Sequence, residues 1–144
     1  MSTARLLLLD TNIVSHLMRE ANGVAAQRLQ AASQAGATPV LSIVVQCELL
    51  YGVRKKSSRW LQEAYDLQMA RLPVLPLDEA EPPHYAALRT HLETQGQPIG
   101  PNDALIAAHA LALGATLVSG DDEFARVPGL KVENWLRPFD TPST

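Results

Sequence analysis

Residues 6–12 read Leu-Leu-Leu-Leu-Asp-Thr-Asn, an apolar run that ends abruptly in a carboxylate, a hydroxyl and an amide. Such a run, with no polar alternation, is typical of a parallel strand that is covered on both faces. We therefore predict a buried strand over residues 6–9. Ligand sites in open α/β sheets lie at the carboxyl ends of the strands, so Asp10 stands where a site is expected.

Strands and helices are predicted to alternate along the rest of the chain. Apolar spacing and turn residues predict a helix from Asn12 onward and further helices over residues 24–35, 43–53, 60–71, 82–94 and 103–113. Short strands are predicted over residues 39–42, 74–77, 116–119 and 131–135, with a helical turn over 123–126. This alternation indicates an α/β fold with a mostly parallel sheet.

The predicted helix ends depend on a few capping residues. We expect Ser42 to cap the helix that follows it, and Asn102 to cap the helix that opens at Asp103. Gly52 and the basic residues after it are predicted to end the 43–53 helix.

Length and composition indicate one globular domain. The chain has 144 residues, 47% of them hydrophobic and 19% charged, so we predict a single domain over 1–144 with its core at about 5–136 and a short proline-containing tail. The net charge of −3 excludes a polybasic nucleic-acid binder, and any nucleic-acid contact needs a local basic patch.

Cysteine usage and apolar runs predict a cytoplasmic protein. Cys47 is the single cysteine and lies in an apolar stretch, so we expect a small core residue in a reducing compartment. The apolar run before Asp10 is shorter than the about 7–15 residues of a signal peptide. The stretch over residues 104–118 falls short of the about 18 apolar residues that span a bilayer, so no membrane association is expected.

Four acidic residues occupy positions that predict a shared site. Asp10 and Asp121 follow two predicted strands, Asp103 lies in the first turn of a buried helix, and Glu48 has apolar neighbours on its own helix. Acids that converge repel one another, and a hard divalent cation with oxygen ligands relieves this repulsion. We therefore expect Mg²⁺ or Mn²⁺ at this place.

Each acid also has a purely structural interpretation. Asp10 is suited to cap a helix, Asp103 to complement a helix dipole, Asp121 to a solvated turn, and Glu48 to extend from an apolar face to water. Zinc is disfavoured, because there is one cysteine and the four histidines lack the spacing of a tetrahedral site. His109 is predicted to be a core residue.

Four motifs in order resemble the PIN-domain ribonucleases, and among them the VapC-type toxins of bacterial toxin–antitoxin pairs. They are Leu8-Leu9-Asp10-Thr11-Asn12-Ile13, Glu48-Leu49-Leu50-Tyr51-Gly52, Pro98-Ile99-Gly100-Pro101-Asn102-Asp103 with the helix after it, and Leu117-Val118-Ser119 with its acidic turn. The four acids are separated by 38, 55 and 18 residues. The resemblance covers nearly the whole chain and implies a PIN-like three-layer sandwich.

The resemblance also implies roles for individual residues. Asp10, Glu48, Asp103 and Asp121 would be the catalytic acids, with Asp10 and Asp103 as the principal metal ligands. Glu48 and Asp121 would complete the shell, directly or through water. The supporting polar residues would be Thr11, Asn12, Asn102 and Ser119.

The acidic turn is one residue shorter than in similar family members. The fourth acid is therefore ranked Asp121 first, Glu123 second and Asp122 third, which makes Glu123 a further candidate ligand.

The function implied is that of a toxic endoribonuclease that hydrolyses RNA, such as tRNA or another structured RNA, with a divalent metal ion. The basic residues Arg54, Lys55, Lys56 and Arg59 are predicted to guide the RNA phosphates, or else to form a solvated helix end. The resemblance further implies a homodimer and a VapB-type antitoxin that covers the site. The helices over residues 24–35 and 60–72 are candidate partner surfaces.

Two alternatives come from other functional classes. A catalytically inert PIN-like module would keep the fold and bind protein or RNA. A small-molecule phosphohydrolase would also place Asp10 after the first strand, but Asn12 stands where such an enzyme needs a second acid. Metal and carboxylates alone do not distinguish RNA from DNA.

Overall fold

A computed structural model describes residues 5–137 of the chain. Its centre is a five-stranded sheet in the order β3-β2-β1-β4-β5, in which every neighbouring pair is parallel. The strands are β1 (Leu6–Leu9), β2 (Thr38–Ser42), β3 (Val74–Leu75), β4 (Thr116–Val118) and β5 (Val132–Glu133). This confirms the predicted parallel sheet, with the Leu-rich run of β1 at its middle.

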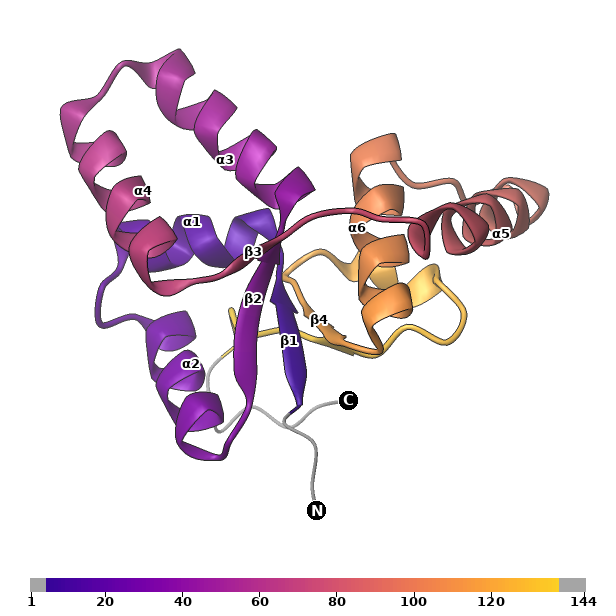
Figure 1. The fold of residues 1–144 in the computed structure, drawn as a ribbon, viewed down its shortest axis with the longest axis horizontal. Helices are drawn as coiled ribbons and strands as arrows, with labels where there is room; N and C mark the ends of the chain where they lie inside the picture. The colour runs from indigo at the N-terminus through magenta and orange to yellow at the C-terminus, as the bar shows by residue number, and fades with distance from the viewer. Residues whose placement is uncertain (1–4, 138–144) are drawn as a thin grey trace.

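Helices cover the sheet on both sides, which makes three layers. α1 (Thr11–Arg19), α2 (Val24–Gln34) and α4 (Arg59–Arg71) lie on one side, and α5 (Glu81–Thr94) and α6 (Pro101–Leu113) lie on the other (Figure 1). α3 (Ile43–Lys56) rises from the carboxyl end of β2 and packs against α1, α4 and α6. The first three strands are added toward one edge of the sheet, and after β3 the chain returns to add β4 and β5 at the other edge. The connection through α5 and α6 therefore covers the opposite face.

Apolar packing explains why short strands suffice. Leu7, Leu8 and Leu9 of β1 have no exposed surface, because they are covered from both sides of the sheet. α6 supplies small side chains to this core, with Ala104, Ala107, Ala108 and Ala110 fully buried, which lets the helix lie close to the sheet.

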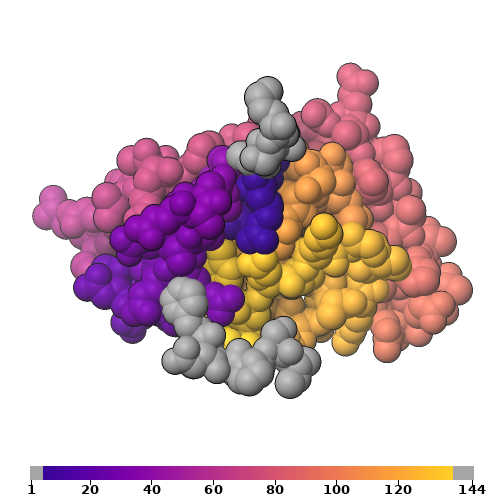
Figure 2. Space-filling view, turned by 90° about the horizontal axis from the view of Figure 1, so that it is seen from below, coloured from indigo at the N-terminus to yellow at the C-terminus, as the bar shows by residue number. Residues whose placement is uncertain are grey.

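The C-terminal part of the described chain closes the lower face of the molecule. A 3-10 helix, η1 (Asp122–Arg126), leads from β4 toward β5. Seen from below, this segment occupies the space between α2 and the α5–α6 pair (Figure 2). Phe124 and Trp135 anchor it, with 0% and 2% of their surfaces exposed.

Two predicted helix ends are wrong. α3 continues through Gly52 to Lys56, because Leu49 and Val53 are buried on its inner face and outweigh the low helix propensity of glycine. α6 begins at Pro101 with Gly100 as its N-cap. Proline suits a first helical position, where its missing N–H has no partner to lose. Asn102 is therefore an exposed residue of the first turn rather than the cap.

Further differences concern the strands and the cysteine. β3 and β5 are two residues long, shorter than the predicted 74–77 and 131–135. Cys47 is exposed, so the prediction of a core cysteine is wrong. The face of α3 that carries Cys47 turns away from the core that its neighbours Val44 and Val45 enter. The predicted proline-containing tail lies outside the described residues from position 138 onward.

No helix within residues 5–137 has the length and apolar character needed to cross a membrane.

Candidate active site

Asp10 lies at the carboxyl end of β1 and is 3% exposed. Its backbone N–H donates to the carbonyl of Val118 at 2.8 Å, which ties it to β4. The Oδ1 atom accepts a hydrogen bond from the Thr11 backbone N–H at 2.8 Å, so Asp10 is also the N-cap of α1. Asp10 is therefore both a helix cap, as its structural interpretation predicts, and part of the acidic region, because its two carboxylate oxygens bond to different neighbours.

Ser119 and Asn12 fix the other oxygen of Asp10. The Ser119 hydroxyl donates to Oδ2 at 2.7 Å, and the Asn12 amide donates to the same oxygen at 3.3 Å. Asn12 Oδ1 accepts from the Gly120 N–H at 3.0 Å, and Ser119 Oγ accepts from the Asp121 N–H at 3.0 Å. These bonds join the start of α1 to the turn after β4, so one carboxylate and one acidic turn are positioned together.

Glu48 reaches the same region from α3. Its Oε1 accepts a hydrogen bond from the Thr11 hydroxyl at 2.6 Å, and the residue is half-buried. Thr11 therefore contacts both acids of this part of the site, Asp10 through its backbone and Glu48 through its side chain.

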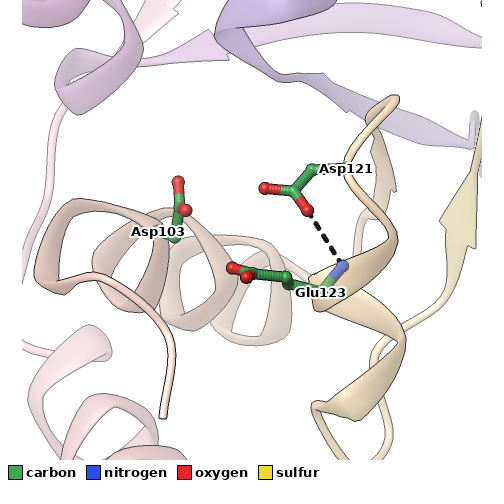
Figure 3. A group of neighbouring side chains, drawn as sticks. All are labelled: Asp103, Asp121 and Glu123. Carbon is green, nitrogen blue, oxygen red and sulfur yellow. Dashed lines mark hydrogen bonds between the residues drawn. The ribbon is translucent and has the colours of Figure 1, made fainter.

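Asp103, Asp121 and Glu123 form the most compact acidic group among the described residues. One ligand oxygen of each lies within 4.8 Å of those of the others. Asp103 extends from the first turn of α6, while the other two come from the turn after β4, and their carboxylates point toward one another (Figure 3). Asp121 caps η1 by accepting from the Glu123 N–H at 2.9 Å.

Asp122 is turned to a different partner. Its Oδ1 lies 3.8 Å from Nη2 of Arg137. Of the three acids in the turn, Asp121 and Glu123 lie beside Asp103, and the ranking of the fourth acid stays a prediction.

The electrostatics of this region are those of crowded carboxylates. The pKa of Asp103 is raised to about 6, first by burial and then by the charges of Asp10, Asp121, Glu48 and Glu123. Burial also raises the pKa of Asp10, and it outweighs the hydrogen bonds from Ser119 and Thr11 that lower it. The charges of Glu48 and Asp121 thus act on both Asp10 and Asp103.

A divalent cation fits this set of donors. The acids offer only oxygen atoms, which suit hard cations such as Mg²⁺ and Mn²⁺. Burial and then the neighbouring negative charges make the ionised form of Asp103 unfavourable in the protein alone. A bound cation would reverse that cost, so the site has both the ligand chemistry and the unmet charge that such an ion requires.

The basic residues do not all approach the acids. Lys56 lines the same groove as Thr11 and Glu48. Lys55 lies over the ring of Tyr51, with Nζ 5.9 Å from its centre, and Arg59 is paired with Glu63 at 3.8 Å on the exposed side of α4. Arg54, Lys55 and Lys56 also occupy the last turn of α3, where positive charge stabilises the helix dipole.

A buried polar group lies where α6 meets the end of β2 and the start of α5. His109, confirmed as a core residue, has no exposed surface, and its Nδ1 is 2.8 Å from the Oγ of Ser42. Its Nε2 is 3.6 Å from Glu81, a 4% exposed acid that the sequence analysis did not single out. Glu81 also accepts from the Asp78 N–H at 2.7 Å. Asp78 and Glu81 have the sequence spacing of a capping box, a local signal that could have drawn attention to this acid, although α5 itself begins at Glu81 with Ala80 as its N-cap.

Comparison with known proteins agrees with this geometry. The PIN domain model matches residues 7–130. Ribonuclease VapC2 of Rickettsia felis is 38% identical over 130 residues, which cover 89% of this chain and 96% of that protein. The tRNA(fMet)-specific endonuclease VapC of Shigella flexneri is 34% identical over 130 residues, with coverage of 89% and 96%.

A solved structure gives the same result in three dimensions. A chain of VapBC2 from Rickettsia felis, crystallised with a DNA fragment from its promoter, matches with a TM-score of 0.84 at 36% identity. The match covers 90% of this chain and 98% of that one. With the order of its strands and the convergence of its acids, the chain belongs to the PIN-domain family and is a VapC-type member of it.

Proposed function

We propose that this protein is the toxic endoribonuclease of a VapBC-type toxin–antitoxin pair and that it hydrolyses RNA with Mg²⁺ or Mn²⁺. The observation that carries the proposal is the group of Asp103, Asp121 and Glu123 at the carboxyl edge of the sheet. Asp10 and Glu48 lie close enough for their charges to raise the pKa of Asp103. Relatives named as ribonucleases, one of them specific for tRNA(fMet), support the activity.

In the proposed mechanism, Asp10 and Asp103 would be the principal ligands of the cation, and Asp121, Glu48 and Glu123 would complete its shell directly or through water. A bound divalent ion lowers the pKa of water and stabilises charge on a phosphate oxygen. Ser119 and Asn12 hold Oδ2 of Asp10 in one direction, and Thr11 does the same for Glu48. These polar residues position carboxylates, so their loss should reduce the precision of the site rather than remove a reacting group.

The expected partners follow from the family. We expect a VapB-type antitoxin to cover the acids, a homodimer of the toxin, and action in the bacterial cytoplasm on tRNA or another structured RNA. Structures of relatives as VapBC complexes support the antitoxin partner.

A matched pair of substitutions in the acidic turn tests the proposal. Purified antitoxin-free protein should cut a mixed pool of tRNA and structured RNA into discrete fragments in Mg²⁺ or Mn²⁺. Asp10→Asn and Asp121→Asn should reduce the rate by about 100-fold or more, because a cation ligand is lost. Asp122→Asn changes the same charge one residue away, where the side chain faces Arg137, and should keep most of the activity.

The outcomes separate the alternatives. Full activity of the Asp10→Asn protein would overturn the assignment of the site. No cleavage by folded wild-type protein would favour the inert binding module, and cleavage of a matched DNA pool at an equal rate would contradict RNA as the substrate.

A further inference from the structure

A groove between α1 and α3 opens beside the acids. Its volume is about 190 Å³, several times the share of about 30 Å³ that one water occupies in the liquid. Its polar and small lining residues are Thr11, Ser15, Arg19, Glu48, Gly52 and Lys56, and apolar side chains from α1, α3 and α4 complete the lining. Thr11 and Glu48, which are hydrogen-bonded to each other, belong to the acidic site as well. The groove therefore adjoins the acidic site.

Gly52 lies inside α3, where neither its backbone conformation nor the packing of neighbouring residues requires a glycine. Its backbone is helical, and a Cβ atom built at this position would meet no atom of the protein within 4 Å. Glycine weakens a helix interior relative to alanine. A helical glycine is usually explained by close packing of a neighbouring element, and here the side on which its Cβ would lie is open space that faces the groove.

Two cations border the groove from opposite helices. Arg19 is the last residue of α1 and Lys56 is the last residue of α3. The hydroxyls of Thr11 and Ser15 lie between the helices as further hydrogen-bonding groups. The protein has a net charge of −3, so two positive side chains at one groove form a local region of positive charge. Such a region favours the binding of an anion.

We propose that this groove binds a backbone phosphate of the RNA strand next to the bond that is cut, and that Gly52 is small so that the strand can approach α3. The inference rests on the proposed ribonuclease function. Arg19 and Lys56 would contact the phosphate, and the Ser15 hydroxyl would contact a phosphate or ribose oxygen. The Thr11 hydroxyl donates its proton to Glu48, so it would accept a hydrogen bond from a ribose hydroxyl instead. Contacts of this kind fix the register of a strand without reading its sequence.

The experiment compares binding and stability of variants that differ at Gly52. In the Asp103→Asn background, which keeps the RNA intact, the probe is a fluorescein-labelled pool of single-stranded RNA oligonucleotides, followed by anisotropy. Gly52→Ala should raise the melting temperature, because alanine favours the helix and its Cβ is unobstructed, yet it should weaken RNA binding several-fold. Gly52→Leu should weaken binding at least tenfold. Ala87→Leu, at an exposed position of α5 on the opposite face of the sheet, is the control for added bulk and should leave binding unchanged.

Charge variants test the phosphate contact independently. Lys56→Gln and Arg19→Gln should each weaken binding and lower the slope of log affinity against log salt by about 0.7, the value for one phosphate of a single strand. Lys131→Gln, an exposed cation before β5 at the other edge of the sheet, is the matched control and should not change the slope.

The results distinguish this inference from the proposed function. If the Gly52→Leu protein with an intact Asp103 cleaves RNA with an unchanged KM, the groove does not bind the strand, and this inference is wrong while the proposed ribonuclease function stands. A lower melting temperature of Gly52→Ala would show that the glycine serves packing and would also overturn it. If the variants keep their RNA affinity but lose capture of a VapB-type antitoxin, the groove binds protein and the inference is wrong. Absence of cleavage by the wild-type protein would remove the proposed function and this inference with it.

Discussion

At the scale of single residues, Asp103 shows how the site opposes the stability of the chain. The first turn of α6 favours a negative charge through the helix dipole. Burial and the neighbouring acids outweigh that effect and raise the pKa of Asp103 to about 6 from its ordinary 3.8. Below about pH 3.8 the Asp103 carboxyl is protonated in both the folded and the unfolded chain, so the full stability is present there, and it is lost as the pH rises through about 6.

The first prediction concerns the melting temperature of Asp103→Asn without metal. At pH 7.5 in EDTA the variant should melt several degrees higher than the wild type, because an ionised and repelled carboxylate has been removed. Differential scanning calorimetry measures the shift, and saturating Mg²⁺ should reverse the order of the two proteins, since only the wild type keeps the full set of ligands. A lower melting temperature of the variant in EDTA would contradict the repulsion.

His109 predicts a pH effect of the opposite sign. Burial lowers its pKa below 6.5 despite the charges of Glu81 and Asp78, which raise it. The folded protein thus holds His109 neutral, while the unfolded chain takes up a proton from about pH 6.5 downward. The stability that the neutral ring contributes is present above pH 6.5 and is lost as the pH falls through the folded pKa.

The second prediction isolates this effect by comparing the wild type with His109→Gln. Glutamine cannot take up a proton in this range, while Asp103, Asp78 and Glu81 remain in both proteins. The difference in free energy of unfolding between the two proteins should shrink as the pH falls from 7.5 to 5. Urea denaturation at several pH values measures it, and a difference that widens toward acid pH would show that His109 is protonated in the folded state.

At the scale of secondary-structure elements, two serine caps differ in burial. Ser42 caps α3 by accepting from the Val44 N–H at 3.1 Å, and Ser58 caps α4 by accepting from the Leu61 N–H at 3.2 Å. Ser42 has no exposed surface and also contacts His109. The two caps are alike in local geometry, but one of them also serves the core.

The third prediction uses these caps as a matched pair. Ser58→Ala should cost about 1 kcal/mol, the usual effect of losing an N-cap. Ser42→Ala should cost about 2–4 kcal/mol, since it adds about 1–3 kcal/mol for a buried histidine nitrogen left without its partner. Equal costs in urea denaturation would mean that the bond between Ser42 and His109 contributes nothing to stability.

Most elements could be predicted from the sequence because their signals are local. The run of residues 6–9 gave β1 with its observed bounds, and Ser42 was correctly predicted as a cap. Gly52 misled the prediction of the end of α3, since burial of Leu49 and Val53 keeps the helix intact beyond it. Burial of this kind is a tertiary effect that a window of sequence does not contain.

At the scale of the whole molecule, the parallel sheet places the acids at one edge. β1 lies between β2 and β4, and the chain changes direction beside it, which is where open α/β sheets bind ligands. Asp10 and Asp121 could be assigned to this edge from the sequence, because Asp10 directly follows its predicted strand and Asp121 follows its predicted strand after one glycine. The bonds from Ser119 to Asp10 and from Asn12 to Ser119 join residues 109 and 107 positions apart, and their geometry required the fold.

The buried pair of His109 and Glu81 escaped prediction for the same reason. His109 was expected in the core, but nothing in its own helix indicated which groups from α5 and β2 would meet it. Exposure of Cys47 was missed because an apolar neighbourhood in sequence was mistaken for burial in space. The catalytic roles of the acids remain predictions, which the following measurement addresses.

The dependence of RNA cleavage on free metal tests the central claim most directly. The antitoxin-free wild-type protein is assayed on the mixed RNA pool in EDTA and then over increasing Mn²⁺ or Mg²⁺, with Asp103→Asn as the control. We predict no cleavage in EDTA, full recovery with excess metal, and half-maximal rates at the metal concentration that gives half of the thermal stabilisation. Undiminished cleavage in EDTA, or in the Asp103→Asn protein, would contradict a metal-dependent ribonuclease built on these acids.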